Sequence, residues 1–155
     1  MQKSKNAFTM IELVFVIVIL GILASVAIPR LAATRTDAEI TRARADVASI
    51  RSAIVSERQS QLITGDSSYM PRLSTGISGD NLFTGSDANR TLLMYGVSAG
   101  DWNNTTTTSG TSDTYTITIN NVTLTFTYSV ANGTFSCSTT AGNDDQDALC
   151  ENIIN

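Results

Sequence analysis

Hydrophobic residues are concentrated near the start of the chain, where they form one nearly uninterrupted run. The run extends from Phe8 to Pro29 with Glu12 as its one charged residue, so residues 13–29 carry no charge. A membrane-spanning helix needs roughly 20 mostly apolar residues. A cleaved secretory signal has a shorter apolar region, about 7–15 residues, followed by a small-residue cleavage site. The run therefore predicts a transmembrane helix.

Beyond this run, apolar residues recur at steps of three and four, which is typical of one face of a helix. This stripe consists of Ile40, Ala43, Val47, Ile50 and Ile54. Gly65 and Asp66 are stop signals, which gives one helix over about residues 8–63. We expect Gly21 and Pro29 to interrupt and kink it, since proline removes a backbone hydrogen bond. Because only about two heptads are clean, we expect the stripe to pack on the protein's own globular part rather than in a coiled coil.

A different pattern, strict alternation of apolar and polar positions, occupies residues 115–130 and predicts β-strands. The apolar members are Tyr115, Ile117, Ile119, Val122, Leu124, Phe126, Tyr128 and Val130. Threonines fill most of the other face, which predicts an antiparallel sheet of three or four strands with one side on the helix stripe and one side in water. Residues 90–96 are predicted as a further strand. Residues 66–90 and 99–113 are predicted as loops, the second with Trp102 exposed.

Two short turns set the expected register of this sheet. Asn120-Asn121 tolerates the positive φ of a two-residue hairpin turn, and Asn132-Gly133 is the stronger turn signal. The first turn predicts the pairs Ile119–Val122, Ile117–Leu124 and Tyr115–Phe126, and the second predicts Val130–Phe135 and Tyr128–Cys137. Both hairpins place their apolar residues on the same face, so the two registers are mutually consistent.

Composition narrows the class of protein. The chain has 155 residues, a net charge of −4 and no histidine. This length suits a single hydrophobic core. The net negative charge argues against nucleic-acid binding. Histidine, the commonest general base and metal ligand, is missing. We therefore expect no enzyme. Both lysines, Lys3 and Lys5, precede the apolar run, which predicts a cytoplasmic N-terminus and an exported remainder.

Residues 7–13, AFTMIEL, followed by VFVIVILGILASVAIPRL, resemble the leader and first helix of type IV pilins and type II secretion pseudopilins. The resemblance implies that prepilin peptidase cuts between Ala7 and Phe8 and that Phe8 becomes N-methylated. The family usually has glycine before the cut, where this chain has Ala7. A carboxylate inside a bilayer needs a partner, and in the family the glutamate at the position of Glu12 pairs with the N-terminal amine of a neighbouring subunit.

The resemblance also implies an architecture and a set of partners. The fold class is α+β and pilin-like: a cleaved leader (1–7), a transmembrane and assembly helix (8–29), the amphipathic half of the same helix (30–64) and a head (65–155) with the antiparallel sheet. The implied partners are further copies in a homo-oligomeric filament, other pilin-like subunits, prepilin peptidase and an inner-membrane assembly platform. Before assembly the head is periplasmic; afterwards the subunit belongs to a periplasmic pseudopilus or a surface pilus. A minor pilin-like subunit for adhesion or DNA uptake, using loop 99–113, is the alternative.

Cys137 and Cys150 lie in the part of the chain expected to be exported, where an even pair of cysteines predicts a disulfide. Many type IV pilins have a C-terminal loop closed in this way. Between the two cysteines we expect an acidic, solvated loop. Its oxygen ligands Asp144, Asp145 and Asp147 make calcium the one candidate cofactor, although the EF-hand pattern fails.

Two asparagines fit an acidic-extended acceptor pattern for bacterial N-glycosylation, D/E-x-N-x-S/T. They are Asn89, within Asp87 to Thr91, and Asn103, within Asp101 to Thr105. Short patterns of this kind also occur by chance in a chain rich in asparagine and threonine. The pattern therefore makes both residues candidates for modification.

Overall fold

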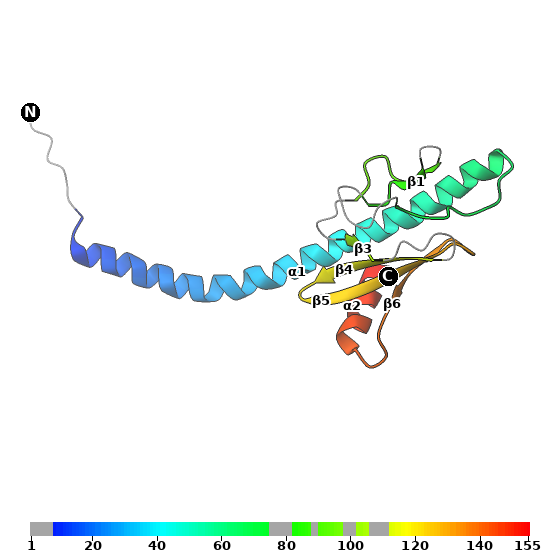
Figure 1. Cartoon of the computed structure of the whole chain (residues 1–155). Helices are drawn as coiled ribbons and strands as arrows, with labels where there is room; N and C mark the ends of the chain where they lie inside the picture. Colours follow the sequence, from blue (N-terminus) through cyan, green and yellow to red (C-terminus); the bar gives the residue numbers. More distant parts are fainter. Residues whose placement is uncertain (1–7, 75–81, 88–89, 98–101, 106–111) are drawn as a thin grey trace, which may run out of the picture. The chain divides into compact units, whose positions relative to one another are not determined.

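The structure is a computed structural model that describes residues 8–74, 82–87, 90–97, 102–105 and 112–155 (Figure 1). It has two units, Met1–Ala38 and Glu39–Asn155. We call the second unit the head, together with the part of α1 that it contains. The helices are α1 (Met10–Ile63) and α2 (Asp144–Ile154), and the strands are β1 (Gly85–Asp87), β2 (Arg90–Thr91), β3 (Trp102–Asn104), β4 (Ser112–Ile119), β5 (Val122–Ser129) and β6 (Thr134–Ser138). The α+β, pilin-like fold is thereby confirmed.

Helix α1 ends where the sequence predicted. Gly65 has a φ of +92°, which glycine adopts without steric cost. Its N–H donates to the carbonyl of Leu62 (3.2 Å), and the N–H of Asp66 donates to the carbonyl of Gln61 (3.0 Å). These two bonds form a Schellman motif, which satisfies carbonyls left over at the end of the helix.

The main sheet is antiparallel with the order β3-β4-β5-β6. The β4–β5 hairpin has the predicted pairs, from Ile119–Val122 to Tyr115–Phe126. Its turn residues Asn120 and Asn121 have φ values of +48° and +63°. Asparagine tolerates this left-handed region better than most residues, so the sequence sufficed to define this hairpin.

The register predicted for β5–β6 is wrong by two residues. Phe135 pairs with Tyr128, and Cys137 pairs with Phe126. The turn is longer than two residues: the N–H of Gly133 reaches back to the carbonyl of Ser129 (2.8 Å). Side chains alternate with a period of two, so a shift of two residues leaves the predicted core face unchanged.

The core of the head lies between the helix stripe and the sheet. Ala43, Val47, Ile50 and Ile54 are buried, and Ile40 is partly buried against the same cluster. On the sheet side, Tyr115, Ile117, Ile119, Leu124, Phe126, Tyr128 and Phe135 are buried in that cluster. The predicted packing of the stripe on the protein's own sheet is therefore confirmed.

Trp102 was expected on an exposed loop, but it is a core residue of β3. Its side chain is 0% exposed and lies edge-on to Phe83 and Phe126, with ring centroids 5.6 Å and 5.2 Å away. Its indole N–H donates to Asp46 of α1 (3.1 Å). A tryptophan in a polar stretch can still be buried when its N–H finds a partner.

The strand expected at residues 90–96 is shorter than predicted. Strand β2 ends at Thr91 and, among the described residues, pairs with β1 alone. Chain pairing continues irregularly to an isolated bridge between Leu82 and Val97. Between the end of β2 and Val97, the chain makes a turn at Met94 and Tyr95. These two side chains are 84% and 80% exposed, because the turn directs them away from the core.

Buried polar groups tie the segment after α1 to the rest of the head. Arg90 makes two hydrogen bonds to Glu57 (2.7 and 3.1 Å) and one to the carbonyl of Ser68. The bond to Glu57 raises the pKa of Arg90. On β4, the carboxylate of Asp113 accepts from the N–H of Leu73 (3.0 Å). These contacts hold an otherwise irregular segment against the helix and the sheet.

Candidate functional site

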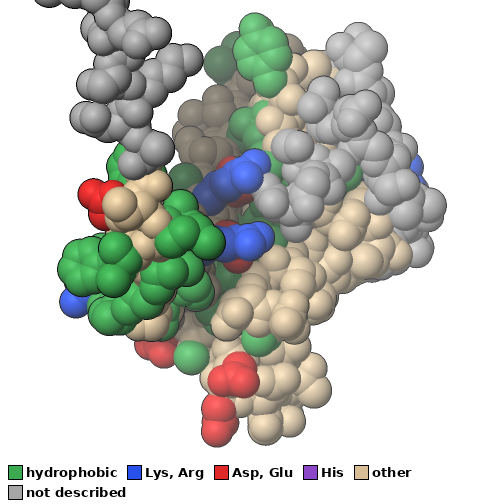
Figure 2. All heavy atoms as spheres, turned by 90° about the vertical axis from the view of Figure 1, so that its left-hand side faces the viewer, with side chains coloured by type: hydrophobic (Ala, Val, Ile, Leu, Met, Phe, Trp, Pro, Cys, Tyr) green, Lys and Arg blue, Asp and Glu red, His purple; other side chains and the backbone are tan. Residues whose placement is uncertain are grey.

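The first unit exposes almost all of its hydrophobic side chains. From Phe8 to Leu31 the large apolar residues of the described chain are 40% to 84% exposed. Figure 2 shows a group of hydrophobic side chains (green) at the end of this unit that faces the viewer. By length and composition α1 can cross a membrane, and none of its most apolar window is buried in the protein. The apolar surface must therefore be covered by a bilayer or by other chains.

Glu12 takes part in the N-terminal cap of α1. Its Oε2 accepts hydrogen bonds from the backbone N–H (3.0 Å) and the hydroxyl (2.9 Å) of Thr9, and the N–H of Glu12 donates to the Thr9 hydroxyl (3.3 Å). This reciprocal arrangement is a capping box, Thr-x-x-Glu. The Thr-x-x-Glu pattern is visible in the sequence, but this cap was not predicted from it. The cap fixes the carboxylate at the first turn of the helix.

No basic side chain is available to Glu12 within residues 8–29, since the sequence has none there. Phe8, just before the start of α1, and Glu12 line the same open hollow of about 370 Å³, together with Ile11, Phe15 and Val16. An ionised carboxylate in an apolar environment needs a cation or strong hydrogen bonds. The carboxylate of Glu12 is therefore held in place and surrounded by apolar side chains. Ala7, the other residue of the predicted cleavage site, lies outside the described residues.

Helix α1 continues through both residues that were expected to interrupt it. Gly21 has no atoms within 4 Å of an added Cβ, so it lies against open space. Pro29 lies inside the helix and cannot donate a backbone hydrogen bond. One turn earlier, the hydroxyl of Ser25 donates a hydrogen bond to the carbonyl of Ile22 (2.7 Å). Neither residue ends the helix, and the predicted kink stays a prediction.

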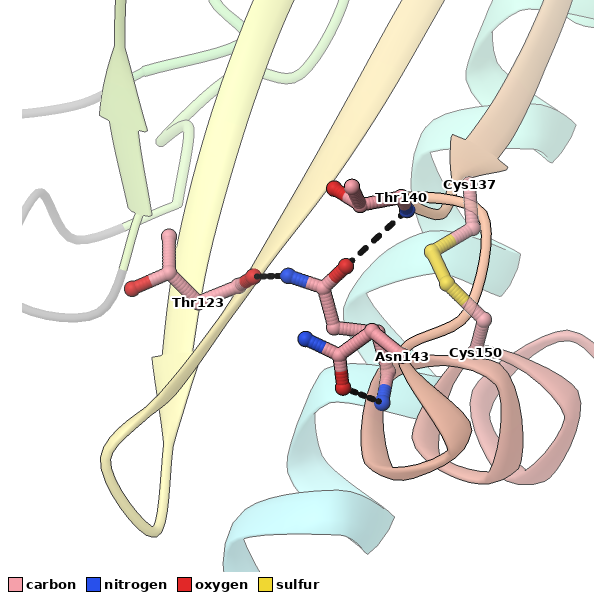
Figure 3. Close-up of a disulfide and its surroundings, with 6 residues drawn as sticks. Thr123, Cys137, Thr140, Asn143 and Cys150 are labelled. Atoms are coloured by element: carbon pink, nitrogen blue, oxygen red, sulfur yellow. Dashed lines mark hydrogen bonds between the residues drawn. A yellow bond between two sulfur atoms is a disulfide. The ribbon is translucent and has the colours of Figure 1, made fainter.

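Residues Asp144–Ile154 form helix α2, so the prediction of a solvated loop between the two cysteines is wrong. Asn143 caps α2, with its side chain accepting from the N–H of Gln146 (3.2 Å). The side chain of Gln146 in turn accepts from the N–H of Thr140 (3.0 Å) and donates to the carbonyl of Thr123 (2.9 Å) (Figure 3). The side-chain amide of Gln146 therefore accepts one hydrogen bond and donates another beside β5, as a backbone peptide group does. At the other end, Arg44 of α1 donates to the carbonyl of Asn152.

The predicted disulfide between Cys137 and Cys150 is present and joins β6 to α2 (Figure 3). Asp144, Asp145 and Asp147 are exposed in the first turn of α2, where carboxylates favour the positive end of the helix dipole. Among the residues that the structure describes, no group of three or more His, Cys, Asp or Glu could hold a metal ion. The helix dipole accounts for carboxylates at these positions, and calcium binding by them stays a prediction.

One of the two candidate glycosylation residues can be placed. Asn103 is exposed on β3, between two buried residues of the same strand. Asn89 lies outside the described residues. Exposure is required for modification, and Asn103 meets that requirement; its glycosylation stays a prediction.

Comparison with known families identifies the N-terminal segment. The model of the prokaryotic N-terminal methylation motif matches residues 2–28. This is the signal of type IV pilins and pseudopilins, so the resemblance seen in residues 7–13 is confirmed. The match covers the leader and the apolar part of α1, and it does not extend to the head. Comparisons with curated proteins and with solved structures find no match.

Proposed function

We propose that the chain is a structural subunit of a type IV pilus or a type II secretion pseudopilus. Prepilin peptidase would remove residues 1–7 and methylate Phe8. The subunit would then wait in the inner membrane with its head in the periplasm, until an assembly platform moves it into a helical filament with further copies and other pilin-like subunits. The methylation motif and the exposed apolar surface of α1 support this proposal.

The observation that carries the proposal is the isolated charge of Glu12. Cleavage before Phe8 creates an amine in a segment that otherwise has no cation. Two opposite charges that pair in an apolar environment offset much of each other's desolvation cost, whereas a single one stays uncompensated. Pairing between the amine of one subunit and Glu12 of its neighbour fixes the axial register of the two helices. Burial of the remaining apolar surface then drives the helices together.

The test compares Glu12→Ala and Glu12→Gln with the wild-type chain, expressed with prepilin peptidase and an assembly platform. Glutamine keeps the shape and the capping ability of glutamate but not its charge. We expect both variants to insert in the membrane and to lose the leader, as intact mass shows, while filaments in the sheared fraction fall by at least about tenfold because the charge pair is lost. Wild-type filament yields from Glu12→Gln would refute the charge pair.

The alternative, a binding subunit that uses loop 99–113, loses its main support. The tryptophan that made this loop attractive is buried against α1. Residues 99–101 and 106–111 lie outside the described part of the chain. The filament subunit is therefore the function we favour.

A further inference from the structure

The outward face of the four-stranded sheet consists of small uncharged side chains. We call it the threonine face. Its members are Asn103 on β3; Ser112, Thr114, Thr116 and Thr118 on β4; Thr123, Thr125, Thr127 and Ser129 on β5; and Thr134, Ser136 and Ser138 on β6. Across the strands, Thr114 pairs with Thr127, and Thr127 pairs with Ser136. The face is a regular grid, with neighbouring strands about 4.8 Å apart.

The absence of charge from this face contrasts with the rest of the head. From Glu39 on, the sequence has six arginines against twelve acids, a net charge of −6, and after Leu73 it has one arginine against eight acids. None of these nine residues belongs to the threonine face, and Asp113, which lies on β4, points into the core. Like charges that meet across an interface are destabilising by several kcal/mol. The threonine face is therefore the part of an acidic head against which a second acidic head can pack with least repulsion.

A filament also requires that the contact join two different surfaces. Packing of a face on its own copy is two-fold symmetric and closes into a dimer, whereas a contact between different surfaces propagates into a helix. The turn at Met94 and Tyr95 is a second uncharged surface, with both side chains at least 80% exposed. Methionine and tyrosine are enriched in protein interfaces, and charged residues are depleted from their centres.

The turn and the threonine face lie on different sides of the head. The sheet packs its inner face on the stripe of α1. The chain next to the turn, at Leu92, borders a hollow together with Ser56 and Ser60, on another side of α1. Figure 1 shows the loops around β1 on one side of α1 and strands β4–β6 on the other. Contacts between these two surfaces can therefore continue from copy to copy.

We propose that in the filament the threonine face of one subunit packs against the Met94–Tyr95 turn of a second copy. The methyl groups of the threonines provide apolar contact for the tyrosine ring and the methionine side chain, and the hydroxyls provide partners for the tyrosine hydroxyl. This inference rests on the proposed function, because it describes a contact between subunits of the filament.

The first test places a charge at the centre of the threonine face. Thr125 lies on β5, between β4 and β6, and Thr125→Gln is the size-matched control for Thr125→Glu. We expect the processed Thr125→Glu subunit to accumulate in the membrane while sheared filaments fall by at least about tenfold, because the new carboxylate is desolvated or repelled. Thr125→Gln should stay within about twofold of wild type. Filaments at wild-type yield from Thr125→Glu would overturn the inference.

The second test does not depend on the stability of a charged variant. Both native cysteines are joined in a disulfide, so a chain carrying Thr125→Cys and Tyr95→Cys together has two new thiols. Oxidation of sheared filaments should give a ladder of covalent multimers, whereas each single variant should give none beyond a trace of dimer. Filaments without a ladder would overturn the contact while leaving the proposed function intact. Absence of filaments from the wild-type chain would overturn both.

Discussion

The two units of this protein use hydrophobic residues in opposite ways. In the first unit Phe15 is 66% exposed, and the other large apolar side chains between Phe8 and Leu31 are exposed as well. In the head, Phe126 is 0% exposed and lies in a cluster with Trp102 and Phe135. Burial of one large apolar side chain stabilises by roughly 1.5–3 kcal/mol. The head gains this free energy when it folds, whereas the first unit gains it only from a membrane or from other chains.

The same helix serves both purposes. Helix α1 runs from Met10 to Ile63, and a stripe of apolar residues in its later part belongs to the core of the head. In its earlier part all faces are apolar, and none of the most apolar window is buried in the protein. A helix that is apolar all round needs an apolar surrounding, and one with a stripe needs a single packing partner. Substitutions should therefore have separable effects in the two units.

The largest expected contrast is between Trp102→Ala and Phe15→Ala. Trp102 is packed among aromatic rings and bonded to Asp46, so truncation should cost about 3–5 kcal/mol of the free energy of unfolding. Phe15 contacts no core, so its truncation should change the stability of the head by less than about 0.5 kcal/mol. Urea unfolding of the detergent-solubilised full chain, followed by circular dichroism, measures both. Equal effects of the two substitutions on the free energy of unfolding would refute the idea that hydrophobic residues have separate roles in the two units.

Sequence reasoning was accurate where a local pattern had one structural solution. The stripe from Ile40 to Ile54 could only be a helix face, and alternation around Asn120-Asn121 could only be a tight hairpin. The second turn was misjudged because tertiary contact overrides local preference: a Cβ on Gly133 would collide with the ring of Tyr69. Arg58 lies over that ring, 3.7 Å from its centroid. Contacts between residues so distant in the chain leave no local signal.

Two errors had a different cause, since the sequence contained the signals. Asn143 and Gln146 form an Asn-x-x-Gln pattern like a capping box, which would have predicted the start of α2. Thr9 and Glu12 form another, which would have predicted the start of α1. In the candidate site, the roles of Glu12 and Phe8 came from family resemblance. The burial of Trp102 depends on Asp46, a partner 56 positions away in the chain, so local polarity alone could not reveal it.

A second prediction concerns Asp113, a carboxylate in the core of the head. It accepts from the N–H of Leu73 (3.0 Å) and the hydroxyl of Tyr115 (3.3 Å). Because Asp113→Ala leaves both donors without this partner, it should cost about 1–3 kcal/mol. Thr9 belongs to the first unit, so the control variant Thr9→Ala should leave the free energy of unfolding of the head unchanged. Urea unfolding measures the difference.

The charge of Asp113 also gives the head a pH dependence. Burial raises the pKa of Asp113, while the bonds from Leu73 and Tyr115 and the charge of Arg72 lower it to a smaller extent. A raised pKa in the folded state means that folding favours the protonated form. This contribution is fully present below the unfolded pKa of about 3.9 and is lost as pH rises through the folded pKa. Relative to Asp113→Asn, the wild-type head should therefore lose stability as pH rises above about 4, up to the raised pKa of the folded state. A constant difference across that range would contradict this.

The smallest expected effect concerns the N-terminal cap of α2, compared with that of α1. Asn143→Ala removes the acceptor for the N–H of Gln146, which should cost about 1 kcal/mol. The disulfide and the contacts of Gln146 hold the rest of α2 in place, so the loss should appear as faster amide exchange in the first turn of α2. Asn143→Ser, which keeps a capping oxygen, should restore protection. If serine is as costly as alanine, the cap is not what stabilises the turn. Thr9→Ala removes the corresponding cap of α1 and should leave exchange in α2 unchanged, because no residue of the head depends on it.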